Sequence, residues 1–348
     1  MASMRTYLKF NEKMEIPTGI AWLIGKCMEA RGKQDLWLKT RPEVMKSLKE
    51  VAMIQSAESS NRIEGVAVDS KRLMPLLAGK VKPMDRPEEE VLGYQKALME
   101  IHKKFSKIDI SPATILKLHK LTNGHSWDAG KWKEKDNEIV EIMSNGERKI
   151  RFKTVSAKET PKAVEQLCLA YQHELAQHKV PELILVSEFI LDFLCIHPFR
   201  DGNGRTSRLL TLLMLYQNGY DVGRYISIER VIENSKEQYY RVLKESSQKW
   251  HENKNNSTSW RNYFLMVLKD VYYELAERVE TFKTLDNKSE IVKQIALGQL
   301  GEFSVADIQS LCPSTSYQLI KKVLSDLKKE KRISLSGSGR GAKWKANK

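Results

Sequence analysis

The chain has 348 residues, of which 41% are hydrophobic, and this is enough for two or three domains with their own cores. No apolar run approaches the roughly 20 residues that span a bilayer, and the N-terminus lacks the apolar region of a signal peptide. The four cysteines are scattered without the paired spacing of a zinc site, so we expect a reduced, cytoplasmic protein that does not bind membranes. The net charge of +14 favours phosphate-bearing or acidic partners.

The first half of the chain predicts several helices and one β-hairpin. The first helix covers residues 41–63, with Pro42 at its start and Gly65 after its end, a pattern typical of helix boundaries. Two further helices are expected over residues 88–105 and 111–121. Two β-rich runs joined around Asn145-Gly146 predict a hairpin over residues 137–153.

The second half is also mostly helical and ends in a small separate unit. Four helices, of which the first two are strongly apolar and therefore buried, are expected over residues 183–196, 209–219, 236–252 and 257–282. A boundary falls near residues 283–290. Beyond it, three short helices and a strand pair over residues 289–348 resemble a winged helix-turn-helix.

The polar stretch from His197 to Arg208, HPFRDGNGRTSR, lies between the two apolar helices and carries the chemistry of a phosphate site. The start of a helix attracts anions, because its first N–H groups lack partners and its dipole is positive there. Arg205 and Arg208 near this positive end are favourable only if an anion such as a di- or triphosphate lies between them. Asp201 offers a hard oxygen ligand to Mg²⁺, and His197, with an ordinary pKa of about 6.5, suits proton abstraction near neutral pH. A capped helix beside a salt-bridged loop explains each residue alone, but not the whole set.

The same stretch matches the signature of the Fic family, His-x-Phe-x-Asp/Glu-Gly-Asn-Gly-Arg-x-x-Arg, at every specified position. The chain therefore resembles Fic proteins, and the resemblance extends over about residues 15–285. Most such proteins transfer AMP from ATP to a Tyr, Ser or Thr hydroxyl of a protein, and a few use other nucleotides or phosphocholine. The resemblance implies ATP as substrate, Mg²⁺ as cofactor and a protein target, with the chain itself as one candidate target.

The resemblance also implies a role for each residue of the motif. His197 resembles the general base, Phe199 the residue that anchors the loop in the core, and Asp201 the Mg²⁺ ligand between the α- and β-phosphates. The anion-binding nest is implied at Gly202, Asn203 and Gly204, with Asn203 near the α-phosphate. The clamps on the β- and γ-phosphates are implied at Arg205 and Arg208.

Two features outside the motif also match the family. Tyr239 stands where the family contacts the nucleotide base, although an aromatic residue in a seam between helices gives the same pattern. The hairpin over residues 137–153 matches the flap whose edge pairs with the target's backbone, and a hairpin with no binding role is the alternative. The flap residues expected to contact the target are Ile142, Ile150 and Phe152. The family often has an arginine at the position of Lys133, so this residue is a mild departure.

A second stretch, SSNRIEG, ends the helix over residues 41–63. Glu64 follows Ser60 by four residues and so lies on the same helix face, and Gly65 supplies a left-handed cap. Taken alone, these residues indicate only a helix end. Beside the Fic signature, Ser60-x-x-x-Glu64-Gly65 resembles the family's inhibitory motif. The resemblance implies a self-inhibited protein in which Glu64 pairs with Arg208 and keeps it from the γ-phosphate of ATP.

Residues 289–348 are basic, with eleven Lys and Arg residues against five Asp and Glu. Most of these cations fall on the third short helix and on the strand pair after it, as expected for phosphate contacts on DNA. They are Lys321, Lys322, Lys328, Lys329, Lys331, Arg332 and Arg340. Winged helices also bind proteins, so DNA and protein partners both stay open, as does a homodimer.

The sequence therefore predicts a mostly α-helical protein in three parts. These are an N-terminal helical segment with the inhibitory helix (residues 1–85), a Fic core with its hairpin flap (86–285) and a winged helix-turn-helix (289–348). The favoured function is Mg²⁺-dependent transfer of AMP from ATP to a protein hydroxyl, held in check by Glu64. Two alternatives remain: removal of AMP from a modified protein by water that Glu64 orients, and a DNA-binding regulator whose Fic core senses nucleotide.

Overall fold

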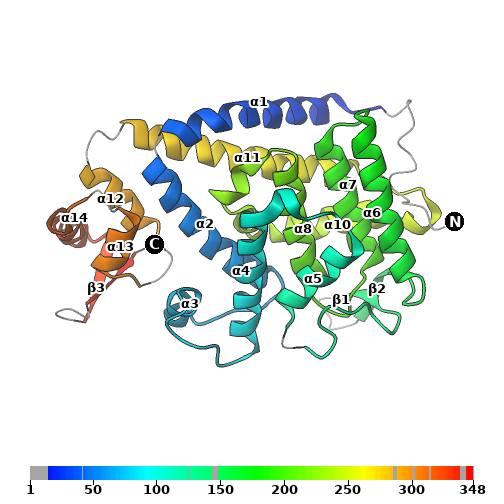
Figure 1. The fold of residues 1–348 in the computed structure, drawn as a ribbon, viewed down its shortest axis with the longest axis horizontal. Coiled ribbons are helices and arrows are strands. Elements are labelled where there is room, and N and C mark those ends of the chain that lie inside the picture. Colours follow the sequence, from blue (N-terminus) through cyan, green and yellow to red (C-terminus); the bar gives the residue numbers. More distant parts are fainter. Residues whose placement is uncertain are drawn as a thin grey trace.

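The computed structural model describes residues 15–40, 42–124, 126–142, 148–284, 288–299, 302–312, 315–337 and 342–347. Within these residues the chain is mostly helical, as the sequence predicts, and Figure 1 shows how the helices are arranged. The helices of the first half are α1 (Thr18–Thr40), α2 (Pro42–Ile63), α3 (Ser70–Leu77), α4 (Arg86–Lys104), α5 (Pro112–Thr122) and α6 (Thr160–Gln177). Those of the second half are α7 (Glu182–Ile196), α8 (Asn203–Gln217), α9 (Ile228–Asn234), α10 (Lys236–Ser247), α11 (Thr258–Thr284), α12 (Lys288–Leu297), α13 (Val305–Leu311) and α14 (Tyr317–Lys329). No helix within the described ranges is long and apolar enough to cross a membrane.

Two apolar helices, α7 and α8, form the centre of the core. Every residue of α7 except Glu182 and Leu194 is buried, and α8 is buried from Arg205 to Tyr216. Helices α6, α10 and α11 pack on α7, while α4 and α5 pack on α8 (Figure 1). Since a helix that is buried on all faces is fixed by its neighbours, the segment that joins α7 to α8 is held firmly at both ends.

Helix α1 lies along α11 at the edge of the molecule (Figure 1) and was not among the helices expected from the sequence. Its buried residues include Ile20, Leu23 and Cys27, which belong to the same apolar cluster as α7 and α8. Three glycines lower the helix propensity of this segment, and Trp22 is largely exposed, so the sequence shows no clean apolar stripe. The division between residues 1–85 and 86–285 stays a prediction, because both ranges contribute to one cluster.

The expected hairpin over residues 137–153 is confirmed. Strand β1 (Glu138–Ile142) pairs antiparallel with β2 (Arg148–Lys153), with an irregularity in the register between Ile139 and Val140. The Asn145-Gly146 turn lies outside the described residues. The hairpin packs by its base on the core, because Phe152 is buried against the ring of Trp250.

The C-terminal unit consists of α12, α13 and α14 and a second hairpin, β3 (Ile333–Ser336) with β4 (Lys343–Ala346). A backbone bridge joins Phe303 to Trp344, so a third extended segment lies beside this hairpin. The unit has its own apolar cluster, centred on residues such as Ile308, Leu324 and Leu327. Helix α13 touches the first half of α2 beside a cavity of about 510 Å³. The order of the elements agrees with the expected three helices and strand pair, and the winged-helix description stays a prediction.

A chain truncated after Thr284 is expected to fold, because the two apolar clusters have separate centres and the half-buried Ile291 packs at the edge of both. The loss of the contact between α13 and α2 should lower the melting temperature by no more than roughly 5 °C, since about 1 kcal/mol shifts Tm by ~2–4 °C at this size. Thermal unfolding followed by circular dichroism tests this. A truncated chain without a cooperative transition would show that the C-terminal unit belongs to the main core.

Candidate active site

The segment between α7 and α8, residues 197–202, is called the motif loop below. Its two ends adopt left-handed backbone conformations, with φ of 52° at His197 and 81° at Gly202. The N–H of His197 still donates to the carbonyl of Phe193 at 2.9 Å, so the histidine closes α7. A non-glycine residue rarely adopts this conformation, which therefore needs strong support from the surroundings.

Phe199 supplies part of that support from inside the core, as expected. Its side chain is fully buried, and its ring stacks on His119 at a centroid distance of 3.7 Å and on Trp132 at 5.3 Å. The amide of Asn203 holds the backbone of Phe199 from the other side: its Oδ1 accepts from the Phe199 N–H at 2.9 Å, and its Nδ2 donates to the Phe199 carbonyl at 2.8 Å. This amide therefore shapes the loop, and the expected role of Asn203 near an α-phosphate stays a prediction.

His119 is a support that the sequence did not reveal. Its Nδ1 accepts from the Gly130 N–H at 3.0 Å, so its Nε2 carries the proton and donates to the carbonyl of Asp201, also at 3.0 Å. Burial lowers the pKa of His119 to about 4, which keeps the ring neutral and preserves this arrangement. One histidine on an otherwise ordinary helix gives no signal in the sequence, because both partners come from other segments.

Lys133 links the motif loop to the base of the hairpin. Its N–H donates to the carbonyl of Pro198, and its Nζ donates to the carbonyl of Ile196, to Asn137 Oδ1 and to Thr154 Oγ1, at 3.2, 2.8 and 2.7 Å. Burial lowers the pKa of this lysine to about 8. Lys133, where this chain differs from the arginine that is common in the family, therefore fixes the motif loop against the hairpin.

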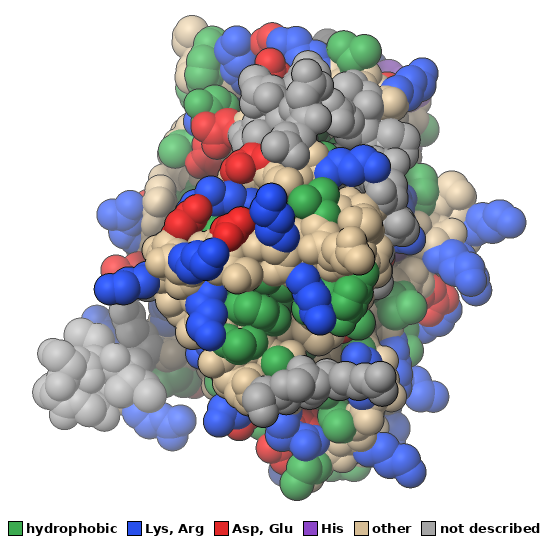
Figure 2. Space-filling model, turned by 90° about the vertical axis from the view of Figure 1, so that its left-hand side faces the viewer, with side chains coloured by type: hydrophobic (Ala, Val, Ile, Leu, Met, Phe, Trp, Pro, Cys, Tyr) green, Lys and Arg blue, Asp and Glu red, His purple; other side chains and the backbone are tan. Residues whose placement is uncertain are grey.

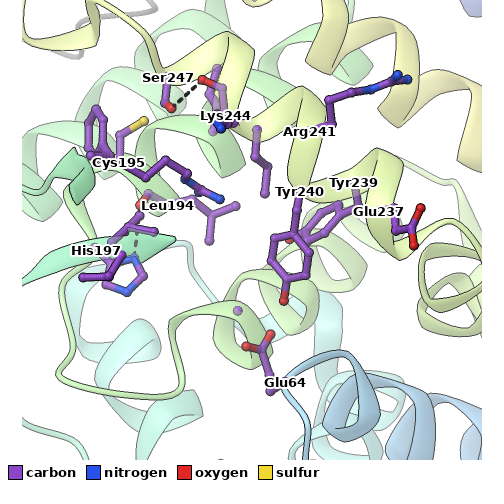
Figure 3. A pocket seen from close by; sticks show the side chains of 17 residues that line it. Glu64, Leu194, Cys195, His197, Glu237, Tyr239, Tyr240, Arg241, Lys244 and Ser247 are labelled. Atoms are coloured by element: carbon purple, nitrogen blue, oxygen red, sulfur yellow. Dashed lines mark hydrogen bonds between the residues drawn. The ribbon is translucent and has the colours of Figure 1, made fainter. Parts of the chain in front are cut away.

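His197 has the tautomer of a general base. Its Nδ1 lies 3.2 Å from the carbonyl oxygen of Leu194, which can only accept, so Nδ1 carries the proton and the lone pair on Nε2 is free (dashed in Figure 3). Burial lowers the pKa of His197 to about 4, and the charge of Lys133 acts in the same direction. The imidazole is therefore neutral near pH 7 and able to take up a proton.

A cavity of about 690 Å³ lies in front of this imidazole. The hairpin closes one side, and α10 with Tyr239 and Tyr240 closes another (Figure 3). Figure 3 shows His197, the hydroxyl of Tyr240 and the carboxylate of Glu64 around the same open space. Arg151 and Lys244 add positive charge to the walls. With Arg241 these cations outnumber the two lining carboxylates, Glu64 and Glu237, so the walls favour an anionic ligand.

The guanidinium of Arg208 lies just behind the cavity, and two of its three nitrogens are held by the end of α2 and the residue that follows it. Its Nη2 donates to Glu64 Oε1 and to the carbonyl of Ser60, and its Nε donates to Ser60 Oγ, each at 2.8 Å. Burial opposes the charge on this arginine, but the Glu64 carboxylate and the neighbouring tyrosines, Tyr239 and Tyr94, together outweigh it and raise the pKa of the guanidinium above its usual range. The structure therefore brings together Ser60, Glu64 and Arg208, and Gly65 ends α2 with a φ of 82° as the sequence suggested.

The end of α2 that carries Glu64 is tied to the core by polar contacts. Ser56 Oγ donates to the buried carboxylate of Glu229 at 2.7 Å, and the hydroxyl of Tyr240 donates to the carbonyl of Ile63 at 3.2 Å. These contacts reach α9 and α10 respectively. The position of the Glu64 carboxylate is therefore set by the packing of a whole helix and not by one flexible side chain.

Arg205 and Asp201 lie beside the motif loop in contacts that the sequence did not predict. The guanidinium of Arg205 is buried and pairs with Glu90 on α4 at 2.5 Å, and it donates to Asn61 Oδ1 at 3.4 Å. Asp201, whose side chain is 53% exposed, accepts from Arg86 at 2.8 Å. Burial tends to raise the pKa of Asp201, but Arg205 and other nearby donors hold it below its usual range. Neither side chain lines the cavity, so their expected roles toward phosphate and metal stay predictions.

Comparison with known proteins agrees with this geometry. Residues 109–215 match the model of the Fic/DOC family, a span that runs from just before α5 to near the end of α8 and includes the motif loop. The chain carries a Fic domain. Curated relatives named protein adenylyltransferase Fic, from Drosophila yakuba and Drosophila melanogaster, are each 28% identical over 190 residues, which is 51% of this chain. The match spans about a third of the length of these relatives.

Solved structures share the fold of the Fic domain and of much of the surrounding chain. A Fic family protein from Desulfovibrio desulfuricans superposes with a TM-score of 0.60 at 20% identity, over 97% of this chain and 98% of that structure. A Fic domain containing signaling protein from Bacteroides thetaiotaomicron gives a TM-score of 0.61 at 20% identity, over 76% of this chain and 97% of that structure. These similarities establish the fold.

Tyr239, which lies beyond the matched span, and the hairpin, which lies within it, are each compatible with more than one interpretation. Tyr239 lines the cavity, and its ring also packs against Tyr240 and Trp260 at centroid distances of 5.2 and 6.0 Å, so it fits both a base contact and a seam between helices. Phe152 is buried and anchors the hairpin, whereas Ile150 is 49% exposed. The side chain of Ile142 lies outside the described residues.

Replacing Gly204 with alanine tests how closely Glu64 is held. An added Cβ would collide with the Glu64 carboxylate, which is the flexible end of a side chain, so the carboxylate must move away from Arg208. We expect Gly204→Ala to lower the free energy of unfolding in urea by roughly 1–3 kcal/mol, the cost of leaving a buried charge poorly paired.

The control for this substitution is the same change in a Glu64→Gly background. There the collision is absent, so the cost of Gly204→Ala should fall by at least about 1 kcal/mol, as is common for residues in contact. An equal cost in both backgrounds would show that Glu64 does not limit the space at Gly204.

The protonation of His197 can be measured directly. Its imidazole should titrate near pH 4 by NMR of a histidine-labelled sample, with His197→Gln used to assign the resonance. Because the unfolded chain takes up this proton near pH 6.5, the folded state loses stability as the pH falls from about 6.5 to about 4. A midpoint at or above pH 6.5 would contradict the burial of the ring.

Proposed function

We propose that this protein transfers AMP from ATP to a hydroxyl group of a target protein. The observation that carries the proposal is the neutral imidazole of His197, with its Nε2 free, in front of a cationic cavity that Arg208 approaches from behind. The name of the curated relatives, protein adenylyltransferase Fic, supports the same reaction.

The proposed reaction is a displacement at the α-phosphorus of ATP. His197 Nε2 removes the proton from the attacking hydroxyl, whose oxygen forms a bond to the α-phosphorus. The bond from this phosphorus to the oxygen that bridges to the β-phosphate breaks, and pyrophosphate leaves. His197 then returns its proton to water. The backbone N–H groups at the start of α8 offer hydrogen bonds to the charge on the transferred group.

The cavity offers places for each part of the nucleotide. Arg208 would clamp the γ-phosphate once it is free of Glu64, and the charge of Arg151 and Lys244 would attract the polyphosphate. Tyr239 would face the base. Arg205, which Glu90 already neutralises, would act mainly by holding α8 and α4 in place.

Mg²⁺ fits the residues that are present. Among the described residues, no group of three or more His, Cys, Asp or Glu side chains could hold a metal ion. Mg²⁺ in nucleotide sites commonly takes only one or two carboxylates and obtains its other ligands from phosphates and water. Asp201 would be that carboxylate, since it is half exposed and its pKa is held low, and it would exchange Arg86 for the ion. The ion would neutralise charge on the phosphates.

The hairpin would hold the target. Among the described residues, strands β1 and β2 pair only with each other, and an extended peptide can add to the edge of such a sheet. Ile150 and Val140, which are 49% and 40% exposed, lie on this hairpin near the cavity and would contact target side chains. Lys133 would hold the hairpin at a fixed position relative to His197 through its bonds to the Ile196 carbonyl and to Thr154.

Glu64 would hold this activity in check. Its carboxylate occupies the guanidinium that the γ-phosphate requires, so the pair and the phosphate exclude each other. Hydrogen bonds to charged groups contribute ~1.5–3 kcal/mol. Since 1.4 kcal/mol corresponds to a factor of ten, the pair would weaken productive ATP binding by roughly 10- to 100-fold.

Glu64→Gly should therefore raise AMP transfer from labelled ATP, onto targets in a lysate or onto the chain itself, by roughly 10- to 100-fold. His197→Ala in the Glu64→Gly background should reduce transfer by roughly 10²–10⁴-fold, the range of a general base. Mass spectrometry of the activated variant should show adducts of the mass of AMP.

Glu237→Gln is the matched control, because it removes another carboxylate of the cavity wall from the exposed face of α10. It should leave transfer close to the wild-type level. If Glu64→Gly and Glu237→Gln transfer AMP equally, the ion pair does not inhibit. If the double variant with His197→Ala stays fully active while it is folded, His197 is not the base.

A further inference from the structure

The C-terminal unit contacts the core through α13, whereas the outer face of α14 points away from the core. Helix α13 is the part that touches α2, whereas α14 packs on α12, α13 and β3 within the unit. In Figure 1 α14 lies at the outer end of the molecule, and Figure 2 looks onto this end. Lys and Arg side chains clearly outnumber Asp and Glu on the described surface of that view.

Helix α14 is divided sharply into two faces. Ile320, Val323, Leu324 and Leu327 are buried in the apolar cluster of the unit. The exposed positions are Tyr317, Gln318, Lys321, Lys322, Ser325, Lys328 and Lys329, none of which is acidic. Lysines that lie close together on one face of a helix repel one another and destabilise the helix. An anion bound over the face relieves this repulsion.

The lysines of this face are mostly uncompensated. The two acidic residues near the end of α14, Asp326 and Glu330, lie 3.5 Å from Lys329 and Lys293 respectively. Among the described residues, no carboxylate lies within ion-pair distance of Lys321, and its Nζ lies 5.1 Å from the ring centre of Tyr317. The charge that two or three lysines carry here therefore remains available to a partner.

The second hairpin extends the same chemistry beyond the helix. Lys343 and Lys345 are exposed on β4, and they pair across the strands with the exposed Ser336 and Ser334. Alternation along the strand turns Trp344 to the opposite face, where it packs on the apolar cluster. Helix α14 and the hairpin thus present lysines and small hydroxyl side chains.

We propose that the exposed face of α14, with the β3–β4 hairpin beside it, binds duplex DNA. A helix of 13 residues is about 20 Å long at 1.5 Å per residue and fits the major groove, which is about 12 Å wide. With α14 in the groove, its lysines and those of β4 reach the phosphates on either side, and Gln318 and Ser325 face the base edges. The face lacks the exposed apolar anchors, apart from Tyr317, that a protein partner would require.

The test measures binding of the full chain to a fluorescein-labelled, 30-base-pair duplex of random sequence by fluorescence anisotropy. If four to six phosphates are neutralised, affinity should fall by roughly 10²–10³-fold between 50 and 200 mM KCl. The double variant Lys321→Gln/Lys322→Gln should lower the magnitude of the slope of log K against log salt by about 1.8, since each lost phosphate contact removes about 0.9. Its affinity at 50 mM KCl should be at least tenfold weaker.

The matched control is Lys158→Gln/Lys162→Gln, which removes the same charge from exposed lysines before and at the start of α6. It should bind with the wild-type affinity and slope, and both double variants should melt at the wild-type temperature. The proposal is overturned if the two double variants bind alike or if the single strand of the same length binds as tightly. Absence of salt-dependent binding to the duplex would also overturn it and leave this face to a protein partner. Because none of these lysines touches the Fic domain's cavity, AMP transfer is a separate readout and should not change.

Discussion

The guanidinium of Arg208 is a permanent positive charge in a place that water does not reach, and most of the site is arranged around this constraint. Leaving such a charge unpaired costs several kcal/mol, so an anion must always lie beside it. The Glu64 carboxylate does so in this structure, at 2.8 Å, from 144 positions earlier in the chain. Under the proposed function, the γ-phosphate of ATP would need the position beside Arg208 that the Glu64 carboxylate holds in this structure, so the two would exclude each other.

The motif loop places a second demand on its surroundings. His197 and Gly202 hold the backbone in left-handed conformations, and only contacts from several elements can keep His197 there. Phe199 contributes from within the core, His119 through the carbonyl of Asp201, and Lys133 through the carbonyls of Ile196 and Pro198. The loop that these contacts fix holds the imidazole with its Nδ1 bound to the Leu194 carbonyl, and burial of the ring lowers its pKa to about 4. The position of the ring and its neutral state near pH 7 therefore both depend on this packing.

The sequence predicted the secondary-structure elements and the burial that are determined by residues close together in the chain. Helix α2, the hairpin and the burial of α7 and α8 follow from local periodicity, and the closeness of Glu64 and Arg208 followed from family resemblance. The pairing of Arg205 with Glu90 and the role of His119 were missed, because both depend on segments that only the folded chain brings together. Helix α1 was missed because its three glycines and exposed Trp22 obscure the apolar stripe that packs on α11. Periodicity and local motifs do not reveal such long-range partners, and only the family resemblance pointed to one of them.

Helix α2 contacts two different parts of the molecule. With 22 residues it is about 33 Å long, its first half lies against α13, and Glu64 follows directly after its last turn. An α-helix is stiff over this distance, so a tilt at one end appears at the other. If a ligand of the C-terminal unit shifted α2 and so altered the Glu64–Arg208 contact, thermodynamic reciprocity would require that release of this contact change the affinity for that ligand by the same factor. The same helix thus contacts the C-terminal unit with its first half and is followed, at its other end, by the carboxylate that lies beside Arg208.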